Sequence, residues 1–184
     1  MRFLRLLCDE NGTDWSDISH TYPINDYPEL SMNEAKTIST LNNLIETCKD
    51  GEQGFLDCAE QVTDKGIKSK LEERAHRCAE GVRELQEQVK QLGEEPETSS
   101  STTGTMHRGW VNFKAKITAQ SDKSILEEVE RGEDIALKSY RKALDADLPA
   151  DIHKIVERQY KGVEQNYKEV REMRERATSP RSPR

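Results

Sequence analysis

Two acidic residues, Glu52 and Glu133, occupy positions at which the helical pattern around them predicts an apolar side chain. A carboxylate in such a position is costly unless it is paired, protonated or bound to a cation. With a helical rise of about 1.5 Å per residue, we expect Glu52 to lie level with Cys78 on the next helix. An internal repeat of 81 residues places Glu133 level with Gln159 in the same way. These four side chains predict a polar layer, which is either a site for iron or manganese or a buried, hydrogen-bonded carboxylate pair.

The metal interpretation has a partial precedent in di-iron helical bundles. There, two helices each supply a Glu and the other two each supply a Glu-x-x-His motif. Glu52 and Glu133 would provide the two Glu, but the layer contains no His. The one literal motif, Glu73 to His76, has an unsuitable helical phase, because Glu73 points outward and His76 lies at the flank. The sequence shows no nucleophile elbow or Gly-rich phosphate loop, so it predicts no catalytic residue and no small-molecule substrate.

Four long helices are predicted from apolar residues that recur at steps of three and four. The first runs from about 35 to 63, and the second ends at Gly93. A linker over 94–105 and a short helix over 106–117 precede the third, and the fourth starts at Pro149. The inward positions are Ile38, Leu41, Ile45, Cys48, Glu52, Phe55, Ala59 and Val62; Leu71, Ala75, Cys78, Val82, Leu85, Val89 and Leu92; Leu126, Val129, Glu133, Ala136, Tyr140 and Ala143; and Ile152, Val156, Gln159 or Tyr160, Val163, Tyr167 and Val170.

The lengths of the connections predict the topology. Short links join the first helix to the second and the third to the fourth, so each of these pairs is antiparallel. The long segment between the second and third helices permits a crossover, which predicts an all-α four-helix bundle with a ferritin-like connection. An up-down-up-down bundle with a decorated middle loop is the alternative.

An internal repeat is indicated when the chain is shifted by 81 residues. Nine positions then coincide between 44–92 and 125–173, among them Glu52 with Glu133 and two pairs of glycines. We interpret this as a duplicated helical hairpin, although common patterning of helical bundles would explain part of the match.

The composition of the chain argues against several classes of function. Charged residues make up 34% and apolar residues 33% of the chain, which favours amphipathic helices over an α/β enzyme core. The net charge of −7 argues against nucleic acid as a partner. The sequence has no apolar run of membrane-spanning length and no Cys-x-x-Cys pair, so we expect a cytoplasmic protein that does not enter a membrane.

The two ends of the chain differ from its middle. Residues 1–31 lack sustained periodicity and are expected to be an irregular or disordered extension, which could even precede the true start at Met32. Ser31 and Glu34 have the spacing of a capping box, so the bundle domain is predicted over 32–177. The basic Ser/Pro tail over 178–184 is expected to be disordered.

Several motifs together resemble a bacterial family of ferritin-like four-helix-bundle proteins of unassigned function. They are Leu41-Asn-Asn-Leu-Ile-Glu-Thr-Cys-Lys-Asp-Gly51, His107-Arg-Gly-Trp110, Glu130-Arg-Gly-Glu-Asp134 and Val156-Glu-Arg-Gln-Tyr160. The resemblance implies a bundle associated with bacterial stress. His107 and Trp110 would fix the short crossover helix to the bundle or, alternatively, bind a partner.

Two hypotheses of function follow from the sequence. The first is a non-enzymatic structural or interaction protein that pairs with itself through a helix face. The second is an iron- or manganese-binding protein that uses Glu52 and Glu133, with Cys78 and Gln159 beside them.

Overall fold

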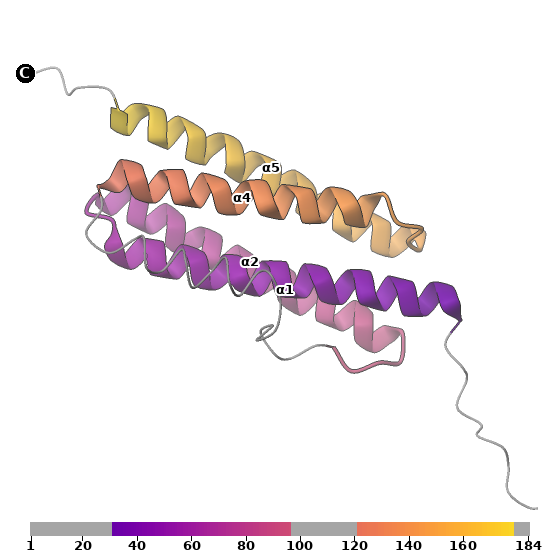
Figure 1. Cartoon of the computed structure of the whole chain (residues 1–184). Coiled ribbons are helices and arrows are strands. Elements are labelled where there is room, and N and C mark those ends of the chain that lie inside the picture. The colour runs from indigo at the N-terminus through magenta and orange to yellow at the C-terminus, as the bar shows by residue number, and fades with distance from the viewer. Residues whose placement is uncertain (1–30, 97–120, 179–184) are drawn as a thin grey trace, which may run out of the picture. The chain divides into compact units, whose positions relative to one another are not determined.

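The computed structural model describes residues 31–96 and 121–178, and the regular structure in this part of the chain is helical throughout. The helices are α1 (Met32–Gln61), α2 (Lys65–Gln91), α4 (Asp122–Leu144) and α5 (Ala150–Thr178) (Figure 1). They agree with the four long helices that the apolar pattern predicts, to within a few residues at each end. The predicted short helix over 106–117 lies outside the described residues, as do 1–30 and 179–184.

Side chains cap the starts of three helices. The predicted capping box at α1 is confirmed: the Ser31 side chain accepts from the Glu34 N–H at 3.2 Å, and the Glu34 carboxylate accepts from the Ser31 N–H at 2.8 Å. The side chains of Asp64 and Ser121 likewise accept hydrogen bonds from backbone N–H groups in the first turns of α2 and α4. These bonds satisfy donors that have no partner inside a helix, so they fix where each helix begins.

The connection between α2 and α4 is a crossover. The carboxylate of Asp122, at the start of α4, accepts hydrogen bonds from the backbone N–H groups of Thr63 (2.8 Å) and Asp64 (3.0 Å), in the turn between α1 and α2. α4 therefore starts at the end of the bundle where α2 starts, and runs parallel to α2 (Figure 1). An up-down-up-down bundle would start its third helix where α2 ends, so that alternative is wrong.

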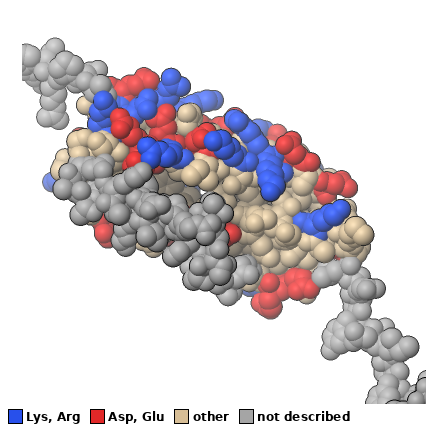
Figure 2. Space-filling view, viewed as in Figure 1, with Lys and Arg blue, Asp and Glu red and all other residues tan. Residues whose placement is uncertain are grey.

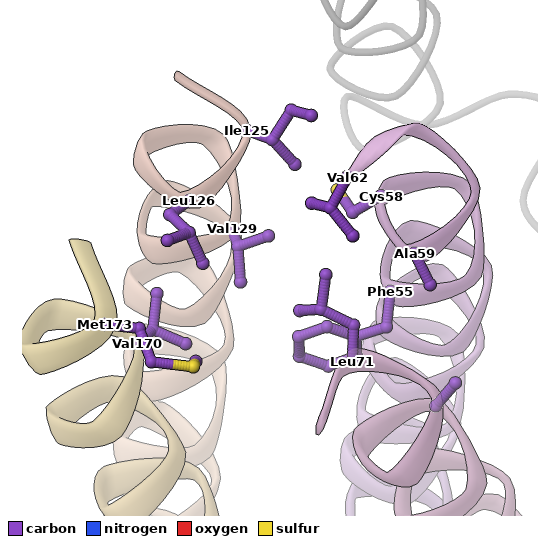
Figure 3. Close-up of a cluster of buried hydrophobic side chains, with 11 residues drawn as sticks. Phe55, Cys58, Ala59, Val62, Leu71, Ile125, Leu126, Val129, Val170 and Met173 are labelled. Atoms are coloured by element: carbon purple, nitrogen blue, oxygen red, sulfur yellow. The ribbon is translucent and has the colours of Figure 1, made fainter. Parts of the chain in front are cut away.

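Two apolar clusters form the core, one toward each end of the bundle. The cluster near the α1–α2 turn is drawn in Figure 3, where side chains of α1 and α4 face each other. Leu71 and Leu126 in this cluster are fully buried, and burial of a Leu side chain stabilises by about 1.5–3 kcal/mol. The buried members of the other cluster are Leu41, Leu44, Ile45, Cys48, Val82, Leu85, Val89, Tyr140, Ala143, Ile152 and Val156.

The duplicated hairpin stays a prediction, because the paired glycines differ in their surroundings. A methyl group on Gly51 would lie 3.3 Å from the Cys78 sulfur, whereas a methyl group on its repeat partner Gly132 would meet no neighbouring atom. Gly81 faces Gln159 and Cys48, while its partner Gly162 faces open space. Close packing explains the glycines of the first hairpin only.

Candidate functional site

Glu133 is the most deeply buried carboxylate of the predicted polar layer. It lies on α4 between Val129 of one apolar cluster and Tyr140 of the other, with 4% of its surface exposed. Burial disfavours the ionised form, and it raises the pKa of Glu133 to about 8 even though Arg74 opposes the shift. One carboxylate oxygen, Oε1, has no hydrogen-bond partner.

Arg74 on α2 brings a positive charge into the same region. Only 3% of this residue is exposed, and its guanidinium donates to the Glu169 carboxylate on α5 at 2.9 Å. Burial lowers the pKa of Arg74, while the negative charges of Glu133 and Glu169 oppose that change. Because arginine keeps its proton in proteins, the side chain is a fixed internal cation between α2, α4 and α5.

Three of the four predicted layer residues share this region. Burial raises the pKa of Cys78, and the charges of Glu133 and Glu52 raise it further. Glu52 is half-buried on α1, and the neighbouring Gly51 leaves room for the Cys78 sulfur. Glu52 and Glu133 thus both act on Cys78 through their charges, but the three residues are not placed so that they could hold a metal ion together. The raised pKa keeps Cys78 a thiol, which is a poor nucleophile compared with a thiolate.

The structure places Gln159, the fourth predicted residue, in a separate hydrogen-bonded chain. Its Oε1 accepts from the Tyr140 hydroxyl at 2.7 Å, and its Nε2 donates to Glu84 at 2.7 Å. Tyr140 is seven residues, or about two helical turns, from Glu133 along α4. Gln159 therefore hydrogen-bonds near the second apolar cluster.

This chain of hydrogen bonds joins all four helices. The Cys48 sulfur lies 3.1 Å from the Tyr140 hydroxyl oxygen. Because Tyr140 gives its proton to Gln159, the thiol of Cys48 is the donor to Tyr140. Burial raises the pKa of Cys48 to about 11, so the thiol keeps the proton that this bond requires. At the surface, Arg158 on α5 forms an ion pair with Glu84 on α2.

Metal-ligating side chains do not gather anywhere in the described ranges, the predicted layer included. No group of three or more His, Cys, Asp or Glu residues is placed there to hold a metal ion. The side chain of His76 is 70% exposed and lies 3.5 Å from Glu80, as its helical phase predicts. His107 and Trp110, the predicted clamp or partner site, lie outside the described residues.

Four buried polar residues were missed from the sequence, of which Arg74 on α2 and Asn166 on α5 bear on this site; the other two are Thr37 and Thr47 on α1. Arg74 and Asn166 each lie one residue before a position assigned to an apolar stripe, Ala75 and Tyr167. The face of a helix inside a bundle is wide enough to include such neighbouring positions. The available signal was therefore the spacing of Arg74, three residues after Leu71, and of Asn166, three residues after Val163 and four before Val170.

Solved structures with a similar fold are ferritin-like. A two-domain protein from Anabaena variabilis with DJ-1/ThiJ/PfpI-like and ferritin-like domains matches with a TM-score of 0.63 at 10% identity, over 82% of this chain and 40% of that one. A point mutant of Dps1 from Mycobacterium smegmatis has a TM-score of 0.62 at 13% identity, covering 77% and 96% of the two chains. A DPS protein from Vibrio cholerae O1 has a TM-score of 0.60 at 17% identity, covering 77% and 90%. These matches confirm the ferritin-like four-helix bundle.

The Vibrio cholerae protein belongs to a broad superfamily of ferritin-like diiron-carboxylate proteins. The residues described here do not fit a diiron-carboxylate centre. Beside Glu133, the chain provides the guanidinium of Arg74, which repels a metal cation, and the sulfur of Cys78. Neither residue is a carboxylate or imidazole ligand of the kind that such centres use.

Sequence comparison identifies the family. No curated protein matches this chain by sequence. The model of a family described as a domain of unknown function, DUF2383, matches residues 36–146, which include most of α1 and all of α2 and α4. Because the match covers more than half of the chain and the fold is ferritin-like, the chain belongs to the DUF2383 family of ferritin-like proteins.

Proposed function

We propose that the protein is a structural or interaction protein built on a ferritin-like bundle, and that it does not act as an enzyme. The observation that best supports this proposal is the buried guanidinium of Arg74 beside Glu133 and Glu169. In a carboxylate metal centre, a bound cation balances the acidic side chains. Here the guanidinium of Arg74 balances Glu169, and burial keeps Glu133 protonated, so neither carboxyl group needs a metal ion to compensate its charge.

The partner that we propose is a second copy of the chain. Three large apolar side chains are exposed in the described part of the chain: Met32 at 76% at the start of α1, Leu56 at 40% further along α1, and Ile135 at 45% on the neighbouring helix α4. Residues 37–45 of α1 also contain no charged residue, although charged residues make up 34% of the chain. Exposed apolar side chains and few charges are typical of the centre of a protein interface.

The oligomer is tested by sedimentation over a wide range of protein concentration. We expect the mass of the wild-type protein to rise above the 21.1 kDa of one chain, and the Leu56→Glu/Ile135→Glu variant to stay near that value. Gln53→Glu, which adds a charge at an exposed position of α1, is the matched control and should associate like the wild type. A wild-type mass that stays at one chain would contradict a self-associating role.

Metal binding through Glu52 and Glu133 is the rival proposal. The proximity of these two carboxylates to Cys78 favours it, with Gln159 as an outer residue and iron or manganese as the ion. Its weakness is that the described residues provide no third acidic or imidazole ligand in a suitable place.

Elemental analysis separates the two proposals. Untagged protein from cells supplemented with iron and manganese is compared with Glu52→Ala/Glu133→Ala, and with the exposed pair Glu60→Ala/Glu127→Ala as the control. Protein that is metal-free, and stays so after anaerobic addition of Fe(II), supports the interaction proposal. Stoichiometric metal that only the first double variant loses would establish the rival.

The setting of this role is also a proposal. The family resemblance supports a cytoplasmic protein that acts in bacterial stress. Survival of a deletion strain under peroxide, with wild-type or Leu56→Glu/Ile135→Glu protein restored, tests this role. On the face seen in Figure 2, acidic and basic side chains are interspersed, which with the net charge of −7 supports the expectation that nucleic acid is not the partner. Within the described part of the chain, no helix is long and apolar enough to cross a membrane.

A further inference from the structure

Three deeply buried polar side chains in the middle of the bundle have atoms without a hydrogen-bond partner. They are Arg74 at 3%, Glu133 at 4% and Asn166 at 8% exposure, on α2, α4 and α5. The unpartnered atoms are Nε and one terminal nitrogen of Arg74, Oε1 of Glu133 and Oδ1 of Asn166. A buried polar atom without a partner costs about 1–3 kcal/mol, so folded proteins rarely leave such atoms unpaired.

Contacts and helix geometry place these side chains at one level. The guanidinium of Arg74 bonds to Glu169 at 2.9 Å and interacts with the charge of Glu133. Asn166 precedes Glu169 by three residues, so both lie on one face of α5. Helical side chains lean toward the N-terminus of their own helix, and the carboxylate of Glu169 therefore extends over the turn that carries Asn166. The Arg74 guanidinium lies at that same turn.

One water molecule can satisfy three of these unpartnered atoms. Water donates two hydrogen bonds and accepts two. The Arg74 nitrogens are donors whose N–H bonds diverge, so one of them can reach the water, and the oxygens of Glu133 and Asn166 are acceptors. Buried waters in proteins typically make about three hydrogen bonds to polar groups that have no other partner.

We propose that one structural water molecule is bound in the middle of the bundle by Arg74, Glu133 and Asn166. It accepts one hydrogen bond from the guanidinium of Arg74 and donates hydrogen bonds to Glu133 Oε1 and Asn166 Oδ1. The water joins α2, α4 and α5. It also gives Glu133 a partner with which to exchange its proton.

Magnetic relaxation dispersion of water oxygen-17 counts the long-lived internal waters of the intact protein and tests the proposal. We expect the count to fall by one in Asn166→Leu, which removes an acceptor while keeping a similar side-chain volume. Gln91→Leu, which removes an exposed amide at the end of α2, should keep the wild-type count. Glu133→Gln, which keeps an acceptor oxygen, should keep the water as well.

Circular dichroism confirms that each variant is folded before the count is made. A crystal structure of the wild-type protein provides an independent measurement and should show one water within hydrogen-bond distance of all three side chains. The proposal is overturned if folded Asn166→Leu keeps the wild-type count, or if Arg74 bonds directly to Glu133 and Asn166 in the crystal with no water between them.

Discussion

The pKa of Glu133 predicts an unusual dependence of stability on pH. In the unfolded chain the carboxyl titrates near its ordinary value of 4.5, and in the folded chain near 8. Between these values the folded state holds a proton that the unfolded state has released. Stability must therefore be highest below pH 4.5, as far as this group is concerned, and fall as the pH rises toward 8. The free energy of unfolding falls by about 1.4 kcal/mol per pH unit while the folded state is protonated and the unfolded state is ionised at this group.

Glu133→Gln isolates this contribution, because glutamine imitates the protonated acid and does not titrate. The free energy of unfolding of the variant, minus that of the wild type, should rise by roughly 2–3 kcal/mol between pH 5 and pH 7, which is about two pH units at the slope above. The difference removes the contributions of groups that the two proteins share. Glu127→Gln on the exposed side of α4 should show no such trend.

The assay is equilibrium unfolding in urea, followed by circular dichroism at pH 5, 6, 7 and 8, with a chelator present to remove metal ions. A difference between Glu133→Gln and the wild type that stays constant from pH 5 to pH 8 would refute the reasoning. It would mean that Glu133 is ionised in the folded protein, and that Arg74 outweighs the cost of burial.

Three further predictions concern packing and capping, each measured by urea unfolding. Gly132→Ala should stabilise the protein by about 0.5–1 kcal/mol, because no atom lies near the new methyl group. Gly51→Ala should stabilise less or destabilise, because its methyl group would lie 3.3 Å from the sulfur of Cys78. Equal effects of the two substitutions would contradict this difference in packing. Asp122→Ala should cost about 1–2 kcal/mol, because it removes the hydrogen bonds to the α1–α2 turn. Burial raises the pKa of Asp122, but the bonds from the turn lower it on balance, so the cost should shrink as the pH falls through this pKa. A cost that is independent of pH down to strong acid would contradict this prediction. Tyr140→Phe should cost about 1–3 kcal/mol, since it interrupts the chain of hydrogen bonds; a neutral substitution would show that the chain is not formed in solution.

The bounds of the helices could be predicted from the sequence, because each helix depends on the residues within and next to it. Apolar steps of three and four locate the helices, and Ser31 with Glu34 locates the start of α1. The crossover followed from the length of the connection alone. The contact that fixes it, from Asp122 to the α1–α2 turn, joins residues 58 and 59 positions apart, which no local pattern reveals.

The polar layer was accessible only in part. A Glu at an apolar position of a helical pattern is recognisable from the sequence, which is why Glu133 was predicted. Arg74 and Asn166 were not found, because a long charged side chain or an amide beside a stripe is ordinarily solvated, and its burial depends on how the other helices pack. The expectation that Gln159 lies level with Glu133 depended on the internal repeat. The turns of the two hairpins differ in length, 62–64 against 145–149, so equivalent positions of the repeat need not lie at equivalent levels.

The buried charges explain the alignment of the helices better than they explain stability. Replacing a buried ion pair with apolar side chains often leaves stability unchanged or raises it, so the pair of Arg74 and Glu169 is a poor candidate for the main source of folding energy. A slip of α5 by one turn, about 5.4 Å, would separate Glu169 from Arg74. The buried guanidinium would then keep only Glu133, which burial holds protonated, at a cost of several kcal/mol. The ion pair of Arg74 and Glu169 therefore favours one register of α5 against α2.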